Sequence, residues 1–186
     1  DNYIRTGMSK NILVIGSEKY SNLLDWNDRS TCVLFGDGAG AVVLSADSNQ
    51  GIISSHIHAD GQYNDLLSVE NNQIKMKGNE VFKVAVNTLS KLVDETLINN
   101  NMDKTSIDWL VPHQANLRII KAAAKKLSLP LDQVVITVDN HANTSAASIP
   151  LALNEAVKDG RIKEDQVLLL EAFGSGFTWG SVLLRY

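Results

Sequence analysis

Two glycine-rich segments that recur along the chain constrain its fold more than any other feature. The first reads FGDG from Phe35 and leads into the apolar run GAVVL at 40–44, and the second reads FGSG from Phe173 and leads into GSVLL at 180–184. Their spacing of 138 residues is the size of an α/β unit rather than of a solenoid repeat. Glycine-rich turns also join strands in unrelated hairpins. We interpret the pattern as the end of one α/β unit followed by a complete second copy.

Short β-rich runs alternate with longer amphipathic runs between these segments. The runs predicted as strands span 11–16, 31–35, 39–44, 51–58, 108–111, 134–138, 167–171 and 178–186. Apolar residues at helical spacing predict helices over 79–99, 115–127 and 145–158, and a polar segment precedes the first of them. This alternation predicts an α/β fold with a mainly parallel sheet and helices on its faces.

Composition excludes several classes of protein. With 44% hydrophobic and 20% charged residues the chain is typical of a globular protein, and no apolar run approaches the roughly 20 residues that cross a bilayer. The formal net charge of -4 gives no field that would favour nucleic acid. The start of the chain also lacks a signal-peptide pattern, so we expect a cytoplasmic protein without a nucleic-acid or membrane partner.

Two features that could suggest metal or disulfide chemistry are weak. The single cysteine, Cys32, cannot form an internal disulfide, and its small side chain in an expected strand is more typical of core packing. His56 and His58 fall on one face of a predicted strand, but no third ligand is evident. We predict no metal site.

Three further motifs give a family resemblance. Residues 111–116 read VPHQAN, 141–148 read HANTSAAS and 171–180 read EAFGSGFTWG, with GNEVFK at 78–83 and DGRI at 159–162. Together with FGDGAG they resemble β-ketoacyl-acyl carrier protein (ACP) synthase III of the thiolase superfamily, in that family's order through essentially the whole chain. The resemblance implies a layered αβαβα thiolase-like fold, with the end of the first half over 1–48 and the second half over 49–186. It also implies a homodimer.

The resemblance implies a catalytic cysteine, histidine and asparagine, of which His113 and Asn143 are present. The family's nucleophilic cysteine begins a helix whose tail resembles DNYIRTG at 1–7, so we expect it upstream of residue 1. From the residues alone, His113 could equally be a core histidine and Asn143 a helix cap. As a pair, however, an imidazole and an amide N–H suit the enolate oxygen that forms when a malonyl thioester loses CO2.

The same resemblance assigns binding roles. The backbone N–H of Ser175 would complete an oxyanion hole, and the glycines beside it allow close approach of a ligand. The residues implied for CoA or phosphopantetheine are Met76, Asn79, Phe82, Ala115, Asn116 and Arg118. Those implied for docking ACP are Lys83, Arg118, Lys125 and Lys126, although such a charged helix face is also common as a solvated surface. Ile74 and Phe173 would line the acyl pocket.

The implied activity is an acyltransferase that joins an acyl-CoA primer, expected to be acetyl-CoA, to malonyl-ACP and so initiates fatty acid biosynthesis. No cofactor is needed beyond these thioester substrates. Two alternatives stay open at this stage: a related acyltransferase with another primer, and an inactive fragment or interaction module. In each case we expect association with a missing N-terminal portion of the same enzyme.

Overall fold

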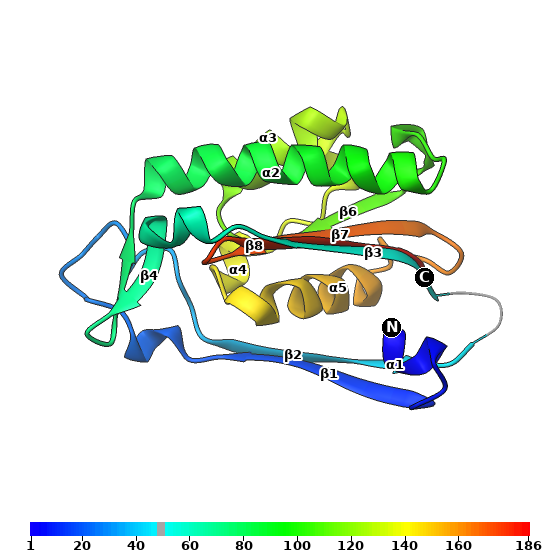
Figure 1. Cartoon of the computed structure of the whole chain (residues 1–186), viewed down its shortest axis with the longest axis horizontal. Coiled ribbons are helices and arrows are strands. Elements are labelled where there is room, and N and C mark those ends of the chain that lie inside the picture. The colour runs from blue at the N-terminus through cyan, green and yellow to red at the C-terminus, as the bar shows by residue number, and fades with distance from the viewer. Residues whose placement is uncertain (48–50) are drawn as a thin grey trace.

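The computed structural model describes residues 1–47 and 51–186, which form alternating helical and sheet layers (Figure 1). Helices α2 (Gly78–Asn99) and α3 (Leu117–Leu127) cover one face of a four-stranded sheet. Helix α5 (Ser148–Lys158) lies between the opposite face and a separate two-stranded ribbon. This α-β-α-β order confirms the α/β class. The boundary expected at 48–49 lies outside the described residues.

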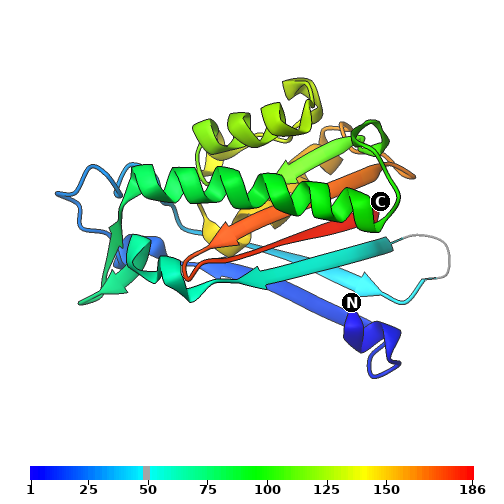
Figure 2. The same cartoon turned by 45° about the horizontal axis from the view of Figure 1, so that its top comes forward.

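The four-stranded sheet has the order β3-β8-β7-β6, with β3 at Gly51–Ala59, β8 at Thr178–Arg185, β7 at Val167–Gly174 and β6 at Trp109–Pro112. Figure 2 shows β3, β8 and β7 side by side beneath α2. Only the β6–β7 pair is parallel; β8 pairs antiparallel with both β7 and β3. The prediction of a mainly parallel sheet is therefore wrong, because a tight turn sends β8 straight back along β7.

The two-stranded ribbon pairs β1 (Asn11–Glu18) with β2 (Gly38–Ser45) in antiparallel fashion. The predicted strand at 31–35 is wrong. Asp28 accepts hydrogen bonds from the backbone N–H groups of Ser30 and Thr31, through its side chain and its carbonyl respectively, and this folds a turn instead. Phe35 makes only one bridge, to Asn143.

A second predicted strand, at 134–138, is also wrong. Val134 makes a single parallel bridge to Leu110, and the chain then enters the short helix α4 (Val138–His141). The polar segment before α2 contains a 3₁₀ turn at Gly61–Leu66 and a hairpin of β4 (Leu67–Glu70) and β5 (Gln73–Met76). Asn71 and Asn72 both have positive φ, as a two-residue hairpin turn requires. The remaining helix, α1, spans Asn2–Arg5.

The core explains why β7 is apolar at every position of its first half. Val167 and Leu169 pack in one cluster with side chains of α2 and α3, whereas Leu168 packs in another with Ala152 and Ala156 of α5. A central strand that is covered on both faces gains from apolar residues at consecutive positions. β7 is thereby fixed between two helical layers, and its last residues lead into the turn that borders the site.

Candidate active site

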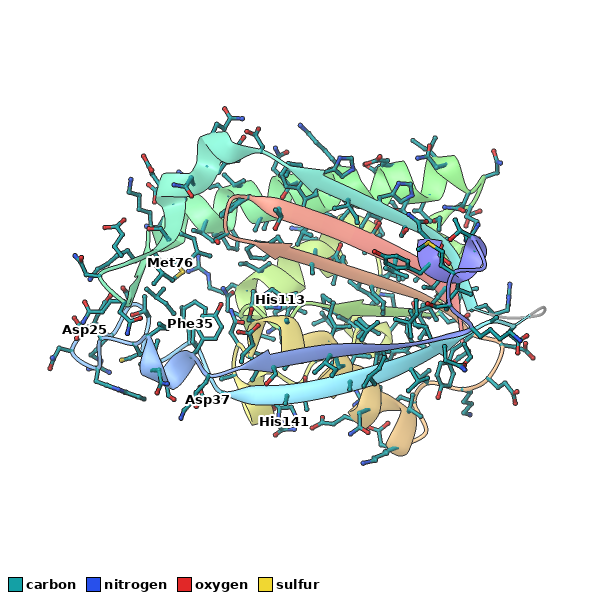
Figure 3. All side chains as sticks on the ribbon, turned by 60° about the horizontal axis from the view of Figure 1, so that its bottom comes forward. Asp25, Phe35, Asp37, Met76, His113 and His141 are labelled. Atoms are coloured by element: carbon teal, nitrogen blue, oxygen red, sulfur yellow. The ribbon has the colours of Figure 1, made fainter. Side chains whose placement is uncertain are left out.

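A cavity of about 320 Å³ lies where β6 and β7 end, and both His113 and Asn143 line it. Its other walls come from the β4–β5 hairpin, the start of α3, the 175–178 turn and the connection that precedes β2. Figure 3 shows that its labelled residues Phe35, Met76 and His113 come from three separate parts of the chain. The structure thus brings together two side chains that lie 30 positions apart in the sequence.

His113 follows β6 directly, and its backbone is tied to β7 because its N–H donates to the carbonyl of Glu171 at 2.7 Å. Its ring Nδ1 lies 2.7 Å from Ser148 Oγ, and its ring meets Phe173 edge-on at 5.6 Å between centroids. Although some of its surface reaches the cavity, desolvation lowers the pKa of His113 to about 4. The imidazole is therefore neutral at pH 7, able to offer one N–H and one lone pair.

Asn143 is held by its backbone and oriented by its own side-chain oxygen. Its N–H donates to the carbonyl of Leu34, and its carbonyl accepts from Gly36. Asn143 Oδ1 accepts the N–H of Ser145 at 2.9 Å, which commits the acceptor end of the amide to the local backbone. The donor end, Nδ2, has no partner among the described residues, so the amide presents N–H groups at the cavity lining.

Glycines of the ribbon allow the Asn143 segment to approach β1 and β2 closely. A Cβ on Gly36 would lie 2.9 Å from the carbonyl of His141, and one on Gly38 would lie 2.9 Å from Thr144 Cγ2. Gly16 faces the Ala146 carbonyl still more tightly. The alternate glycines of FGDGAG therefore form a flat surface against which residues 141–151 pack. The sequence shows this glycine spacing, but the close packing of residues 141–151 against it becomes visible only in the folded chain.

Ser175 lies in the exposed turn between β7 and β8 and borders the same cavity. Two backbone hydrogen bonds join the residues just beyond it to the end of β3: Phe177 N–H donates to the Asp60 carbonyl at 2.7 Å, and Asp60 N–H returns the bond at 2.8 Å. The turn is thus fixed at the cavity rim, where its backbone can face a bound group.

Comparison with known proteins connects this geometry to a family. Sequence models described as 3-Oxoacyl-[acyl-carrier-protein (ACP)] synthase III and as the C terminal of that synthase match residues 1–61 and 97–186 respectively. The chain belongs to the 3-oxoacyl-ACP synthase III family. It is 59% identical over 199 residues to a β-ketoacyl-ACP synthase III of Thioalkalivibrio sulfidiphilus and 62% identical over 195 residues to one of Aliivibrio fischeri.

Solved structures of the synthase III family agree with the fold. The crystal structure of 3-oxoacyl-ACP synthase III from Aquifex aeolicus, at 47% identity, superposes with a TM-score of 0.98, covering all of this chain and 61% of that one. The Thermus thermophilus enzyme gives a TM-score of 0.95 at 40% identity. The predicted family and thiolase-like fold are confirmed. The chain spans about three fifths of the length of the curated relatives it matches, 62% in the first two named.

The substrate residues expected from synthase III motifs fall into two groups. Ile74, Met76, Ala115, Asn116 and Phe173 all line the cavity. Phe82 and Asn79 do not border it among the described residues; instead Phe82 lies under the guanidinium of Arg118, 5.0 Å from its ring centroid. Val81 and Tyr20 do line the cavity and were missed, since nothing in their local sequence distinguishes them from core or surface residues.

The four basic residues expected at a synthase III docking surface are all exposed and lie on α2 and α3. Lys83 is on the first, and Arg118, Lys125 and Lys126 are on the second. The last two stand in the final turn of α3, where positive charge also stabilises the helix dipole. The three basic residues of α3 extend from its first turn, which follows the cavity-lining Asn116, to its last turn.

Three other polar groups lie away from the cavity. Cys32 is half-buried in the 31–34 turn, with its Sγ 3.8 Å from the Trp26 carbonyl, so the expectation of a strand residue in the core is wrong. His58 Nε2 pairs with Glu95 Oε2 at 2.8 Å, and His56 Nδ1 lies 3.6 Å from the other oxygen.

No helix in the described part of the chain is long and apolar enough to cross a membrane.

Glu171, in the second half of β7, is a buried ionisable group outside the main cavity lining. Its side chain is 1% exposed, and neither carboxyl oxygen has a partner among the described residues. Burial raises its pKa to about 8, so the neutral acid dominates at pH 7. It faces a second cavity of about 60 Å³ beneath α2 and α3, which Ser90 and Lys126 also line.

Proposed function

We propose that this chain forms the decarboxylating half of a β-ketoacyl-ACP synthase III, an acyltransferase that condenses an acyl-CoA primer with malonyl-ACP. One observation carries the proposal: a neutral imidazole and an amide with its donor end free line a single cavity. Loss of CO2 from a malonyl thioester leaves an electron pair that delocalises onto the thioester oxygen. Two preorganised N–H donors stabilise that oxygen without giving up a proton.

The acyl-enzyme step needs a thiolate, and we propose that it comes from a cysteine outside these 186 residues. Cys32 is the single cysteine of the sequence and is absent from the cavity lining. The thiolate attacks the primer thioester and releases CoA; the carbanion from malonyl-ACP then attacks the acyl-enzyme and expels the thiolate. The Ser175 backbone N–H would stabilise the tetrahedral oxyanion of this second step.

For the primer we propose acetyl-CoA. The cavity of about 320 Å³ is shared by the reacting groups and by Ile74, Met76 and Phe173, which leaves little room for a long acyl chain. Asn116 and the β4–β5 hairpin line the cavity, and we propose that a phosphopantetheine arm enters past them and past Arg118 at the start of α3. By the motif resemblance we assign Asn79 and Phe82 to the same route, and Phe82 contacts Arg118. A longer or branched primer is the alternative outcome, and competition between acyl-CoA substrates of increasing length distinguishes the two.

We further propose that acyl carrier protein docks on the exposed face that carries Lys83, Arg118, Lys125 and Lys126. Exposed basic side chains on the two helices suit an acidic partner and would chiefly accelerate encounter. By the resemblance of its motifs, the enzyme is also proposed to be a cytoplasmic homodimer. The halves at 1–48 and 49–186 would then belong to one continuous thiolase-like fold.

The test uses the complete polypeptide that contains this sequence. His113→Ala and Asn143→Ala are each expected to lower the rate of malonyl-ACP decarboxylation about 100-fold or more, as removal of an oxyanion donor does in other enzymes. Transfer of acetyl from CoA to the protein should fall much less, because that step does not use the enolate. His58→Ala is the matched control, since His58 lies outside the cavity lining.

Unchanged decarboxylation in both cavity variants would overturn the proposed roles of His113 and Asn143. A wild-type polypeptide that carries out neither decarboxylation nor acyl transfer would favour a non-catalytic interaction module. Loss of acyl transfer with decarboxylation retained would reverse the assignment of the two half-reactions. Both outcomes are read with malonyl-ACP and acetyl-CoA supplied separately, so that each half-reaction is measured by itself.

A further inference from the structure

We propose that Ser148 is a positioning residue that fixes the proton of His113 on Nε2, the ring nitrogen left free for the cavity. This inference rests on the proposed function for its effect on decarboxylation. The position of the His113 proton itself does not depend on the proposed function. Ser148 is the first residue of α5 and lies under the cavity floor, 2% exposed. Its role follows from counting the hydrogen-bond donors and acceptors around one buried hydroxyl.

The Ser148 hydroxyl has two partners among the described residues. One is the backbone N–H of Gln114, 3.3 Å from Oγ, and the other is His113 Nδ1 at 2.7 Å. A backbone N–H can only donate, so Oγ accepts from Gln114. The hydroxyl proton then has a single acceptor within reach, which is His113 Nδ1. If Nδ1 carried a hydrogen instead, this buried hydroxyl proton would have no partner, an arrangement that native proteins avoid.

The proton of His113 is therefore placed on the other nitrogen. Burial holds the pKa of His113 near 4, so the ring carries one proton at neutral pH. With Nδ1 accepting from Ser148, that proton belongs to Nε2. Nε2 has no partner among the described residues, and His113 lines the cavity, so its N–H is available to a ligand.

Asn143 is oriented by a similar device within the same short segment. Its Oδ1 is occupied by the Ser145 N–H, three residues before Ser148, so that its N–H groups are left over. Residues 143–148 thus set both cavity side chains as donors: one through a backbone N–H, the other through a hydroxyl. Two residues of this segment, Thr144 and Ala147, are buried at 1% and 0% exposure, which limits its freedom to rearrange.

The consequence for catalysis is a difference between the two tautomers. A ring with the proton on Nδ1 would point a lone pair at the developing enolate oxygen and repel it. In serine proteases, a change of partner that leaves the histidine in the wrong tautomer costs about 10⁴-fold in turnover. Removing the Ser148 hydroxyl only releases the preference, so the expected loss here is smaller, about 10- to 100-fold.

The decisive measurement is ¹⁵N–¹H NMR of the histidine side chains in the complete polypeptide, with His113 assigned through His113→Ala. The wild-type protein is expected to show the proton on Nε2 and an acceptor shift at Nδ1. Ser148→Ala should lose this preference and lower decarboxylation turnover about 10- to 100-fold, with KM for malonyl-ACP little changed. Ser148→Thr, which keeps the hydroxyl, should recover the Nε2–H signal and most of the rate.

A wild-type ring protonated on Nδ1 would overturn the proposal without any variant. So would a folded Ser148→Ala protein that keeps both the Nε2–H signal and the full rate. Ser55→Ala is the matched control, because Ser55 is exposed on β3. If the tautomer follows Ser148 as expected while His113→Ala leaves decarboxylation intact, then the positioning contact holds and the proposed function is what fails.

Discussion

At the scale of single residues, burial gives His113 and Glu171 opposite effects on how stability depends on pH. The pKa of His113 is lowered from 6.5 to about 4, so the unfolded state binds the extra proton between these values and stability rises with pH there. The pKa of Glu171 is raised from 4.5 to about 8, so the folded state binds the extra proton and stability falls as pH rises between these values. Over their shared range the two contributions oppose each other.

This opposition predicts the behaviour of Glu171→Gln. The amide cannot ionise, so the variant should lack the fall in unfolding free energy that wild type shows from pH 6.5 to 8, which amounts to at most about 1.4 kcal/mol per pH unit. From pH 4.5 to 6.5 its stability should rise with pH, since only His113 then contributes. Urea unfolding of the complete polypeptide at several pH values measures both. Exposed Glu164→Gln is the control, and parallel curves for wild type and Glu171→Gln would refute the assignment.

The residue scale also shows what a sequence can reveal about a site. The family resemblance of the motifs around His113 and Asn143 predicted that the two side chains share one site, and both line the cavity. From the residues alone, each could equally have been structural. The roles of Ser148 and Val81 were not visible, because each depends on which atoms lie opposite after folding. Ser148 stands in a motif but is one of three serines or threonines there, and Val81 has the spacing of an ordinary core residue.

At the scale of elements, the close contact between the β1–β2 ribbon and the 141–151 segment makes a second prediction. A Cβ on Gly16 would overlap the backbone carbonyl of Ala146, and backbone there cannot move without disturbing Asn143 and Ser148. Gly16→Ala should therefore cost about 1–3 kcal/mol of unfolding free energy, the usual cost of overpacking. It should also lower decarboxylation turnover.

The control for this prediction is Gly61→Ala. A Cβ at Gly61 meets no atom within 4 Å, so this variant should match wild type in both stability and turnover. Chemical denaturation and malonyl-ACP decarboxylation, each measured on both variants, separate a packing effect from a general intolerance of alanine. Equal stability of Gly16→Ala and wild type would contradict this prediction, because it would show that the β1–β2 ribbon can move away from Ala146 at no cost in free energy.

Two elements whose sequence patterns arise from burial against neighbouring layers were predicted correctly. The apolar run of β7 predicted a buried strand, because β7 packs between helices on both faces of the sheet. The helical spacing of apolar residues predicted α2, because one face of that helix packs on the sheet. The strands expected at 31–35 and 134–138 have apolar or β-branched residues but no ladder to join. Asp28 folds the first into a turn, and Val134 meets Leu110 at one position only. Pairing partners, rather than propensity, decided those cases.

At the scale of the whole molecule, the outward face of the β1–β2 ribbon is apolar and uncovered among the described residues. Leu13, Ile15 and Val43 are 60%, 63% and 66% exposed, whereas the inward face packs on α5 and on the Asn143 segment. Such side chains on one face of a paired ribbon make a contiguous apolar patch, which is unusual on a monomer's surface. β2 also carries no charge across its length that would discourage association.

This face predicts how the 186-residue chain behaves when expressed by itself. It should self-associate and bind a hydrophobic dye such as ANS, and the double variant Leu13→Lys/Val43→Lys should reduce both, because two charges then interrupt the patch. Sedimentation velocity and dye fluorescence measure the change. A matched double variant at exposed polar positions, Ser55→Lys/Asn79→Lys, adds the same charge elsewhere and should leave association unchanged. If both double variants reduce self-association and dye binding equally, net charge rather than the apolar face controls association.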